Sequence, residues 1–403
     1  MEFMEKKTFK DIKVTGKKVL VRVDYNVPLD ENGNITDDTR IKATLPTLNY
    51  LIKQGARVIL CSHLGRPNGV VTPGLSLAPV AKKLSSILEI PVKMASDAVG
   101  ESAKSIAKSL KNGEVMMLEN IRFYPEEEKN DDNFARELAS LADIFVNDAF
   151  GTAHRAHAST AGVACHLPAV AGFLMGSEIM ALGGYVQNAE MPFVVILGGA
   201  KVSDKIGVIS NLLNKASTIL IGGAMANTFI AAKGGKLGFS RYEKDKIDVA
   251  KQILAKAEAL NVKVLLPVDV VASREFSENA KCKTMDAFNI ADGWQAMDIG
   301  KKTRKLFANE IKRAKTVVWN GPMGVFEFKK FKDGTKAVAK AMAKNDCITI
   351  VGGGDSAAAI QALKLTDKIT HISTGGGASL KYLEGAVLPG VEMLLNKDAK
   401  VKV

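Results

Sequence analysis

The chain has 403 residues, of which 47% are hydrophobic and 24% charged, a composition typical of globular domains. This length exceeds what one hydrophobic core usually supports, so we expect two domains and exclude disordered, low-complexity and solenoid proteins. The formal net charge of +12 suits an anionic ligand, and nucleic acid is the first candidate on charge alone. Aromatic residues are only 6% of the chain, however, and acidic residues separate the lysines, so no surface for stacking bases is indicated.

The sequence indicates a soluble, cytoplasmic protein without a membrane partner. Residues Met1–Asp11 mix Glu and Lys without the apolar segment of a signal peptide, and no apolar run approaches the roughly 18 residues of a membrane span. Cys61, Cys165, Cys282 and Cys347 are too far apart for a zinc or redox motif. We expect them to be reduced thiols that serve packing.

Short apolar runs rich in β-branched residues alternate with helix-like segments along the whole chain. The predicted strands are Lys17–Val23, Arg57–Cys61, Glu114–Leu118, Asp143–Asn147, Phe193–Leu197, Thr218–Ile221, Val262–Leu266, Thr316–Trp319 and Ile348–Val351. The predicted helices include Arg40–Gln54, Ala78–Ile87, Phe134–Leu141, Asp245–Leu260 and Ser356–Leu365. Continuous apolar runs are typical of strands buried on both faces, so this alternation predicts parallel sheets with right-handed crossovers.

The strand and helix rhythm breaks between Leu167 and Gln187, where Pro168 precedes a long, Gly-interrupted helical stretch. We therefore expect an α/β fold of two Rossmann-like three-layer (αβα) domains with parallel sheets, joined by a hinge helix. The predicted boundaries are 1–172 for the N-terminal domain, 173–187 for the hinge helix, 188–385 for the C-terminal domain and 386–403 for a tail that returns to the first domain. The Gly-rich segment Ser373–Ser379 is a candidate second hinge.

Arginine and histidine side chains gather after the first four predicted strands, and Arg40 opens the first helix. The residues read Arg22-Val-Asp24-Tyr-Asn26-Val-Pro28, Ser62-His63-Leu-Gly65-Arg66-Pro67, Glu119-Asn120-Ile-Arg122 and Asp148-Ala-Phe-Gly151-Thr-Ala-His154-Arg155-Ala-His157. The carboxyl ends of parallel strands meet at one edge of a sheet, and guanidinium groups bind phosphate and carboxylate oxygens. A single arginine is as well explained by a surface ion pair, and a single histidine by a loop or core hydrogen bond. Four successive strand ends with the same chemistry predict a site for a small, highly anionic molecule.

Glycines take this position in the second half of the chain. The strand ends read Gly198-Gly199-Ala-Lys201-Val-Ser-Asp204-Lys205, Gly222-Gly223-Ala-Met, Asn320-Gly321-Pro322, Gly352-Gly353-Gly354-Asp355-Ser356 and Thr374-Gly375-Gly376-Gly377. Glycine lets the backbone approach a ligand closely, and a glycine turn before a helix directs free N–H groups at phosphate oxygens. One such loop is often only a tight turn, but five in one domain indicate a nucleotide site.

Two other function classes remain as alternatives: an oxidoreductase that uses a dinucleotide, and a non-enzymatic binder of anions or nucleic acid. The chain lacks the G-x-x-x-x-G-K-S/T P-loop and the His-Arg-Asp loop of protein kinases. Gly352–Ala357 matches the dinucleotide motif G-x-G-x-x-A, but no Asp or Glu follows about 20 residues later, within Thr370–Gly377. An oxidoreductase, or a non-enzymatic anion or nucleic-acid binder, would leave the arginine set and the missing P-loop unexplained together.

Taken together, these motifs resemble the phosphoglycerate kinase family over essentially the whole chain. The resemblance rests on Arg22–Pro28, Ser62–Pro67, Leu118–Phe123, Asp148–Ser159, Leu197–Lys205, Trp319–Pro322, Gly352–Ser356 and Ser373–Ser379. It implies a glycolytic phosphotransferase, a kinase that moves the 1-phosphoryl group of 1,3-bisphosphoglycerate to ADP, giving 3-phosphoglycerate and ATP. It also implies a monomer that acts by hinge bending and does not bind nucleic acid.

The resemblance further implies a role for individual residues. The first domain would bind the phosphoglycerate through Asp24, Asn26, Arg40, His63, Arg66, Arg122 and Arg155. In the second domain Gly222, Gly223 and Pro322 would flank adenine, Glu327 would bind the ribose, and the phosphates would contact Lys201, Lys205, Asn320, Gly353, Gly354 and Ser356. Asp355 would hold Mg²⁺ with ADP or ATP.

The implied chemistry needs positioning and positive charge rather than a covalent nucleophile. Arg40 and Lys205 are the expected catalytic cations, aided by the backbone N–H groups of Gly376 and Gly377. The accepting carboxylate is already ionised at neutral pH, so no general base is required. One segment departs from the family pattern, because Ala296-Met-Asp-Ile-Gly-Lys301 stands where the family often has a Gly-Leu-Asp-Ile-Gly-Pro-like run.

Overall fold

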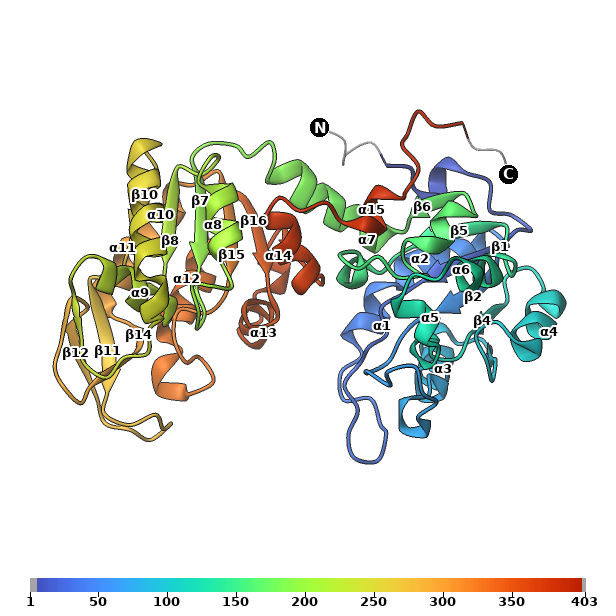
Figure 1. Cartoon of the computed structure of the whole chain (residues 1–403), viewed down its shortest axis with the longest axis horizontal. Coiled ribbons are helices and arrows are strands. Elements are labelled where there is room, and N and C mark those ends of the chain that lie inside the picture. The colour runs from blue at the N-terminus through green and yellow to red at the C-terminus, as the bar shows by residue number, and fades with distance from the viewer. Residues whose placement is uncertain (1–5, 401–403) are drawn as a thin grey trace. The chain divides into compact units, whose positions relative to one another are not determined.

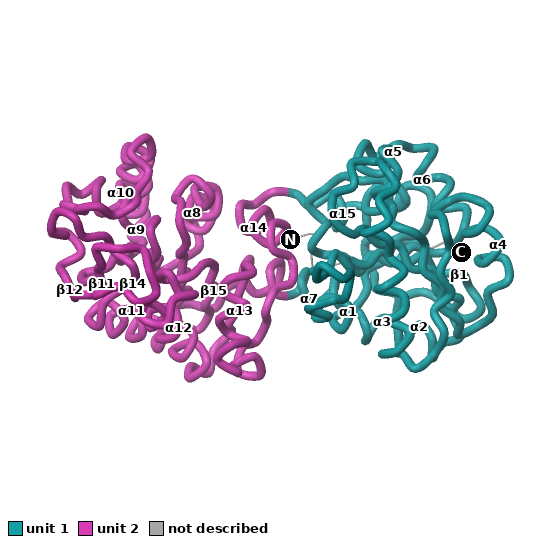
Figure 2. The backbone as a smooth tube through the Cα atoms, turned by 90° about the horizontal axis from the view of Figure 1, so that it is seen from below, with its two compact units in different colours: residues 1–180, 387–403 teal, residues 181–386 magenta. Residues whose placement is uncertain are grey.

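The computed structural model describes residues 6–400 and divides into two compact units, which Figures 1 and 2 distinguish. Unit 1 comprises residues 1–180 and 387–403, and unit 2 comprises residues 181–386. Within the described chain, each unit is built on a six-stranded sheet whose strand pairs are all parallel. The predicted α/β fold with two parallel sheets is therefore confirmed.

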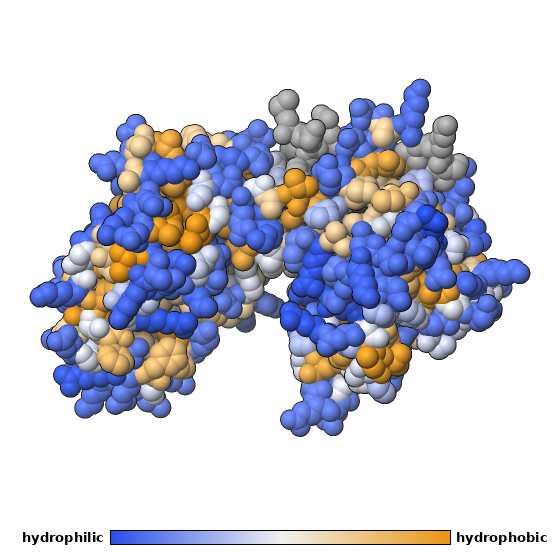
Figure 3. All heavy atoms as spheres, viewed as in Figure 1, coloured by the Kyte–Doolittle hydropathy of each residue, from blue (hydrophilic) through white to orange (hydrophobic). Residues whose placement is uncertain are grey.

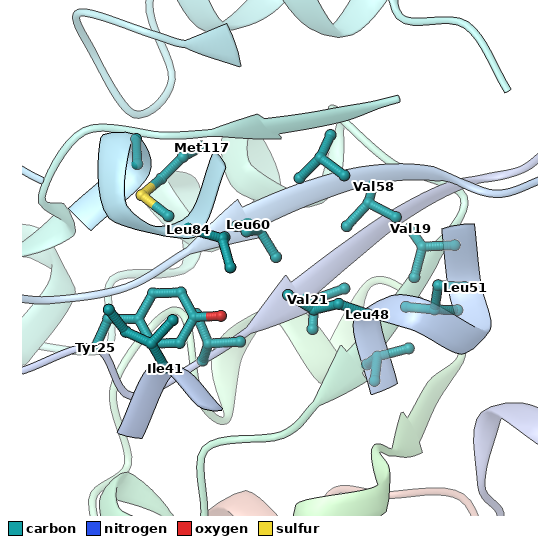
Figure 4. Packing of buried hydrophobic residues seen from close by; sticks show 14 of the residues in the cluster. Val19, Val21, Tyr25, Ile41, Leu48, Leu51, Val58, Leu60, Leu84 and Met117 are labelled. Atoms are coloured by element: carbon teal, nitrogen blue, oxygen red, sulfur yellow. The ribbon is translucent and has the colours of Figure 1, made fainter. Parts of the chain in front are cut away.

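The sheet of unit 1 has the strand order β3-β4-β2-β1-β5-β6. Val19 of the central strand β1 lies opposite Val58 of β2 on one side and Ile144 of β5 on the other. Figure 4 shows side chains of β1 and β2, such as Val21 and Leu60, packed against Leu48 and Leu84 of the covering helices. The strand bounds are β1 Lys18–Arg22, β2 Arg57–Cys61, β3 Val92–Met94, β4 Val115–Met117, β5 Ile144–Asn147 and β6 Ala169–Ala171.

Helices cover both faces of this sheet, with α1, α2, α3 and α7 on one side and α5 and α6 on the other (Figure 2). The helix predicted over residues 40–54 is two helices, because Thr44 ends α1 and Pro46 stands in the first turn of α2. The bounds are α1 Thr39–Ala43, α2 Leu45–Lys53, α3 Ala78–Leu88, α4 Glu101–Ser109, α5 Pro125–Glu128, α6 Asp132–Ala139, α7 Phe173–Glu178 and α15 Pro389–Glu392. Short 3₁₀ turns occupy Phe9–Asp11, Pro73–Leu75, Ile121–Phe123, Phe150–Thr152 and Gly162–Cys165.

Unit 2 repeats this plan with the strand order β10-β8-β7-β15-β16-β17. Helices α8, α9, α10 and α14 lie over one face, and α11, α12 and α13 over the other (Figure 2). The strands are β7 Phe193–Leu197, β8 Thr218–Ile221, β10 Lys263–Leu265, β15 Thr316–Asn320, β16 Ile348–Gly352 and β17 His371–Ile372. The helices are α8 Ile206–Leu212, α9 Met225–Ala232, α10 Ile247–Ala259, α11 Lys301–Arg313, α12 Asp333–Ala343, α13 Gly354–Ala362 and α14 Gly377–Leu383, with 3₁₀ turns at Lys244–Lys246, Lys329–Phe331 and Thr366–Lys368.

Unit 2 also contains two small sheets that the sequence did not predict. One is the antiparallel sheet β12-β11-β14, formed by Cys282–Asp286, Asp269–Ser273 and Gln295–Ile299. The other pairs β9, Lys236–Leu237, with β13, Asn289–Ile290. Four of the five residues of β12 are exposed, so these strands lack the continuous apolar runs of the central sheets.

The segment between the two units is helical. Helix α7 continues directly into a π-helix over Ile179–Tyr185, and the division between the units falls inside it, after Met180. The C-terminal segment packs within unit 1, where the Leu395 N–H donates to the Ala169 carbonyl at 2.9 Å and the Lys7 N–H donates to the Leu395 carbonyl at 2.7 Å. This segment therefore extends the hydrogen bonding at the β6 edge of unit 1.

The surface of each unit is mainly hydrophilic in the face that Figure 3 shows, with hydrophobic patches scattered between. Among residues 6–400, no helix has both the length and the apolar character needed to cross a membrane. The four cysteines are free thiols, but Cys165 and Cys282 are exposed. The expectation that all four serve packing is therefore wrong for these two, because each lies outside the central strands that bury Cys61.

Candidate active site

The residues that the sequence singled out in unit 1 lie at the carboxyl edge of its sheet. Asp24 and Asn26 follow β1, His63 and Arg66 follow β2, Arg122 follows β4 and Arg155 follows β5. Strands β4, β2, β1 and β5 are neighbours in the sheet, so all four loops open at the same edge. This is where ligands bind in open α/β sheets, because loops and helix N-termini converge there.

Hydrogen bonds hold these loops to one another. The Arg40 Nη1 donates to Asp24 Oδ2 at 2.6 Å, and the Asn26 Oδ1 accepts from the Gly65 N–H at 2.9 Å. Arg122 Nη1 donates to the Gly65 carbonyl at 2.8 Å. Arg40 keeps 42% of its side chain exposed although it is paired, so it can bind a ligand without breaking a buried contact. The edge is thus a connected surface rather than a set of separate loops.

Asn120 is a positioning residue that stood in a predicted strand-end motif but was not among the expected site residues. Its side chain is fully buried and caps the 3₁₀ turn that carries Arg122, with Asn120 Oδ1 accepting from the Arg122 N–H at 3.1 Å. Its Nδ2 donates to the carbonyls of Leu64 and Leu75 at 2.8 and 2.9 Å. The signal was its place next to Glu119 in a strand-end motif, but only the fold shows that it joins two loops.

The electrostatic field at this edge is strongly positive. Burial lowers the pKa of His63 well below its usual value, and the charges of Arg22, Arg122, Arg40 and Arg155 lower it further. Burial and the same arginines, Arg122, Arg22 and Arg155, lower the pKa of His157 to about 4. Both imidazoles are therefore neutral at pH 7. The structure brings Arg22, Arg40, Arg122 and Arg155 within electrostatic range of one imidazole, whereas Arg66 is exposed and takes no part in these contacts.

The second group of candidate residues lines a cavity of about 670 Å³ at the carboxyl edge of the sheet in unit 2. This volume is in the range of small-molecule sites. The lining residues come from the loops after β7, β15 and β16 and from the start of α14: Gly198, Gly199, Ala200, Lys201, Asp204, Lys205, Asn320, Gly321, Pro322, Gly353, Gly354, Asp355, Ser356, Gly376, Gly377 and Leu380.

Two helices begin at this cavity, each after a glycine with a positive φ. Gly353 has φ +87° and precedes α13, and Gly376 has φ +50° and precedes α14. L-residues with side chains rarely adopt this conformation, so glycine is required at both turns. The first N–H groups of a helix have no partner within it and carry partial positive charge. The cavity is therefore suited to phosphate oxygens.

Lys205 and Asn320 form a buried polar pair in the cavity wall. Lys205 Nζ donates to Asn320 Oδ1, and only 8% of Lys205 is exposed. Burial lowers the pKa of Lys205 to about 8, although Asp204, Asp355 and Glu384 oppose the shift. The Asn320 Nδ2 is buried and has no hydrogen-bond partner among the described residues. A buried donor without an acceptor costs about 1–3 kcal/mol, so this amide fits a ligand oxygen.

Three residues expected at the nucleotide do not line the cavity. Gly222 lies against Met323, and a Cβ on Gly223 would come within 2.6 Å of the Gly199 backbone nitrogen, but neither glycine is among the lining residues. Glu327 is exposed in the loop between β15 and α12. Lys301, at the start of α11, also lies outside the lining set. Asp204 and Leu380, by contrast, line the cavity and had not been selected as site residues.

A divalent cation bound with a nucleotide would find two carboxylates at this cavity, those of Asp204 and Asp355. Asp355 is exposed, lines the cavity and stands in the first turn of α13. Within residues 6–400, no group of three or more His, Cys, Asp or Glu side chains is close enough to hold a metal by itself. Mg²⁺ is commonly held by one or two carboxylates together with substrate phosphates, so the donor set fits a nucleotide-bound Mg²⁺ rather than a resident metal centre.

The chain is similar to phosphoglycerate kinases along nearly its full length. A model of the family described as phosphoglycerate kinase matches residues 9–386. The phosphoglycerate kinase of Clostridium novyi is 56% identical over 397 residues, which cover 98% of this chain and 100% of that protein. That of Chloroflexus aggregans is 56% identical over 400 residues, with the same shares covered.

Solved structures show the same likeness. The structure of phosphoglycerate kinase from Coxiella burnetii matches with a TM-score of 0.89 at 42% identity, covering 96% of this chain and 98% of that one. The crystal structure of the enzyme from Pyrococcus horikoshii matches with a TM-score of 0.83 at 37% identity and the same coverage. The strand-end arginines, the glycine-lined cavity and these matches agree, and the chain belongs to the phosphoglycerate kinase family.

Proposed function

We propose that this chain catalyses the reversible transfer of the 1-phosphoryl group of 1,3-bisphosphoglycerate to ADP, giving 3-phosphoglycerate and ATP. The observation that carries this proposal is the pairing of two sites within one member of the family. One unit presents arginines at its sheet edge, and the other has a glycine-lined cavity with two helix N-termini. The reaction is a step of glycolysis, and the enzyme is a phosphotransferase with a carboxyl group as acceptor.

In unit 1 we assign the phosphoglycerate to Asp24, Asn26, Arg40, His63, Arg66, Arg122 and Arg155. This ligand carries a phosphate and a carboxylate or acyl phosphate, which suit guanidinium groups geometrically and electrostatically. His63 is neutral at pH 7, so it serves as a hydrogen-bonding group and not as a cation. The positive charge of the site comes from the arginines.

In unit 2 we assign MgADP or MgATP to the cavity. The phosphates lie against Lys201, Lys205, Asn320, Gly353, Gly354 and Ser356, and Asp355 binds Mg²⁺. The unpartnered Asn320 amide and the free N–H groups at the start of α13 support this placement. Gly222, Gly223 and Pro322 are assigned to the adenine side and Glu327 to the ribose. When bound with the nucleotide, Mg²⁺ neutralises phosphate charge.

The protein's own groups then stabilise the transferred phosphoryl group. Its negative charge spreads over the equatorial oxygens during transfer, so cations and N–H donors placed around it lower the barrier. We assign this role to Arg40, Lys205 and the backbone N–H groups of Gly376 and Gly377. The carboxylate of 3-phosphoglycerate is ionised at neutral pH, so its attack needs no general base.

Direct in-line transfer requires the two substrates to meet, so we propose that binding of both drives hinge bending and domain closure. The helical segment from α7 to Tyr185 and the turn before α14 are the candidate hinges. Closure would also exclude water from the acyl phosphate. Small-angle scattering should show compaction only when both ligands are present, and an unchanged radius of gyration would count against closure.

We further propose that the enzyme is a cytoplasmic monomer that binds neither nucleic acid nor membranes. The +12 charge is consistent with its anionic substrates. Size-exclusion chromatography with light scattering tests the monomer. Binding to duplex DNA that falls steeply with salt, and that MgATP does not affect, would instead favour the nucleic-acid alternative.

The decisive assay is the formation of an acyl phosphate from 3-phosphoglycerate and MgATP, trapped with hydroxylamine. We expect product that depends on protein, ATP, Mg²⁺ and 3-phosphoglycerate. Bound ATP without product would retain the assignment of unit 2 but reject the substrate. A change of NADH fluorescence on adding the protein would point to the oxidoreductase alternative.

A further inference from the structure

A chain of buried polar side chains lies beneath the arginine cluster of unit 1. It consists of Glu127, Ser159, Arg22 and His63, which are 0%, 0%, 1% and 4% exposed. They come from α5, the loop after β5, strand β1 and the loop after β2. Only His63 belongs to the residues assigned to the phosphoglycerate, so the proposed function gives the other three no role.

Glu127 and Arg22 determine the direction of every hydrogen bond in this chain. Ser159 Oγ accepts from Arg22 Nε at 2.8 Å and donates to Glu127 Oε1 at 2.7 Å, because a guanidinium only donates and a carboxylate only accepts. The Ser159 N–H donates to Glu127 Oε2 at 2.8 Å, so both carboxylate oxygens are held. Arg22 Nη1 also donates to the Val23 carbonyl. The guanidinium is thus fixed on two sides.

The same logic determines the tautomer of His63. Arg22 Nη2 lies 3.3 Å from His63 Nδ1, and since Arg22 can only donate, Nδ1 is the acceptor. Asp24 Oδ1 would favour the opposite tautomer, but it lies 3.9 Å from Nδ1, beyond hydrogen-bond range. The neutral ring therefore carries its proton on Nε2, which leaves this N–H as the donor of His63 for an anionic ligand.

Glu127 also balances charge in this buried layer. Burial raises the pKa of its carboxyl group above the usual value, and the charges of Arg22 and Arg122 and the hydrogen bonds from Ser159 offset only part of this rise. His157 Nδ1 lies 3.7 Å from Glu127 Oε1 on the other side. Without this carboxylate, the charge of Arg22 would be buried without a nearby anion. The Ser159 hydroxyl, which binds Arg22, would also lose the group to which it donates.

We propose that Glu127 and Ser159 are positioning residues for phosphoglycerate binding: they hold Arg22 so that it fixes His63 in the Nε2–H tautomer. The inference rests on the proposed function for the identity of the ligand. It does not depend on that function for the state of His63, which can be measured in the protein without any ligand.

The test compares Ser159→Ala with Ser159→Thr in the full-length protein. Alanine removes the hydroxyl that links Arg22 to Glu127, whereas threonine retains it. Glu127→Gln disturbs the same link from its other end, and Glu126→Gln is the matched control, because it makes the same change next to it on α5 without a contact to Ser159 or Arg22. Thermal unfolding of each variant identifies any that fail to fold.

Two readouts are taken on each protein. Nitrogen-15 NMR of labelled histidine, with the His63 signals assigned through His63→Gln, reports which ring nitrogen is protonated. Hydroxylamine-trapped turnover gives kcat and the KM values for 3-phosphoglycerate and MgATP. We expect Nδ1 of His63 to be unprotonated in the wild type, in Ser159→Thr and in Glu126→Gln.

In Ser159→Ala and Glu127→Gln we expect mixed tautomer signals and a KM for 3-phosphoglycerate raised about tenfold, the effect of one charge-assisted hydrogen bond, with the KM for MgATP unchanged. A His63 that carries its proton on Nδ1 in the wild type would overturn the proposal. So would a folded Ser159→Ala variant with unchanged His63 signals. If the wild type does not use 3-phosphoglycerate, the proposed function fails, and the NMR signals alone decide the positioning role.

Discussion

Both units place their candidate site at the carboxyl edge of a parallel sheet, but unit 1 builds it from cationic side chains and unit 2 from glycine loops. Unit 1 uses long cationic side chains, such as Arg40 and Arg122, that reach over a rigid edge. Unit 2 uses the absence of side chains, since Gly353 and Gly376 expose helix N-termini at the cavity. Guanidinium groups give strong attraction and fork geometry, whereas backbone N–H groups give close approach. The two sheet edges therefore offer a phosphate group two physically different kinds of contact.

This difference makes opposite kinds of substitution harmful in the two units. In unit 1 function should be lost when a side chain is removed, and in unit 2 when a side chain is added to a glycine. Lys201 and Lys205 are exceptions in unit 2, because both are cationic side chains within the glycine-lined cavity.

Arg40→Ala should lower turnover by about 10³-fold or more, by analogy with arginines that stabilise transferring phosphoryl groups. The fold should survive, because the Arg40 side chain is 42% exposed. The measurement is hydroxylamine-trapped turnover at saturating substrates. Arg136→Ala, which removes an exposed arginine paired with Asp132 in the same unit, is the control. Near-normal turnover in Arg40→Ala would remove Arg40 from the catalytic role.

Lys205→Ala should lower turnover by about 10²-fold, the usual effect of losing one preorganised stabilising group. Because burial lowers its pKa to about 8, Lys205 is charged below that pH and neutral above it. Affinity for MgADP should therefore fall as the pH rises through about 8, as calorimetry can measure. Lys205→Arg should abolish this fall, since arginine stays charged. Lys251→Ala, on an exposed helix face, should behave like the wild type; a pH-independent wild type would contradict the prediction.

Asp148→Asn should change how the stability of unit 1 depends on pH. Burial raises the pKa of Asp148 from 3.8 to about 7, so the folded unit keeps a proton that the unfolded chain has released. The stabilisation from this group is complete below the unfolded pKa and is lost as the pH rises through about 7. Between about pH 5 and 6.5 the wild type should lose about 2 kcal/mol relative to the variant.

Hydrogen exchange of the β5 amides measures this effect in unit 1. Tryptophan fluorescence would report only on unit 2, because both tryptophans, Trp294 and Trp319, lie there. Asp298 is the matching group there, since burial raises its pKa to about 7 as well. Asp298→Asn should produce the same change in tryptophan-detected unfolding. Parallel pH profiles of wild type and variant in either unit would show that its carboxyl group does not retain a proton.

Gly353→Ala should weaken MgADP binding about tenfold, because Gly353 has φ +87° and ψ +140°, a backbone region that costs an L-residue about 1–3 kcal/mol. Its Cβ would also lie 3.2 Å from the unpartnered Asn320 Nδ2. Gly74→Ala in unit 1 is the control, because its φ is not in the left-handed region and a Cβ there meets nothing within 4 Å. Equal nucleotide affinities of the two variants would mean that the glycine loops are not the phosphate site.

Much of the fold could be predicted from local sequence patterns. Each continuous apolar run, such as Phe193–Leu197, became a strand of a central sheet, because only strands buried on both faces tolerate such runs. The strands β11, β12 and β14 could not be predicted, since their mixed polar residues lack that signal. The single helix predicted over residues 40–54 is interrupted at Thr44, where packing and Pro46 decided against the longer pattern.

The sequence alone determined which residue types lie at the two sheet edges. The residues that follow parallel strands must meet at one edge, and their types can be read directly from the sequence. Tertiary structure alone decided which of them are buried, paired or exposed. Lys205 and Asn320 are 115 positions apart, and Arg22 and Ser159 are 137 apart, yet each pair shares a buried hydrogen bond. Hydrophobic periodicity is a local property, whereas burial and hydrogen-bond partners depend on distant segments that only the folded chain brings together.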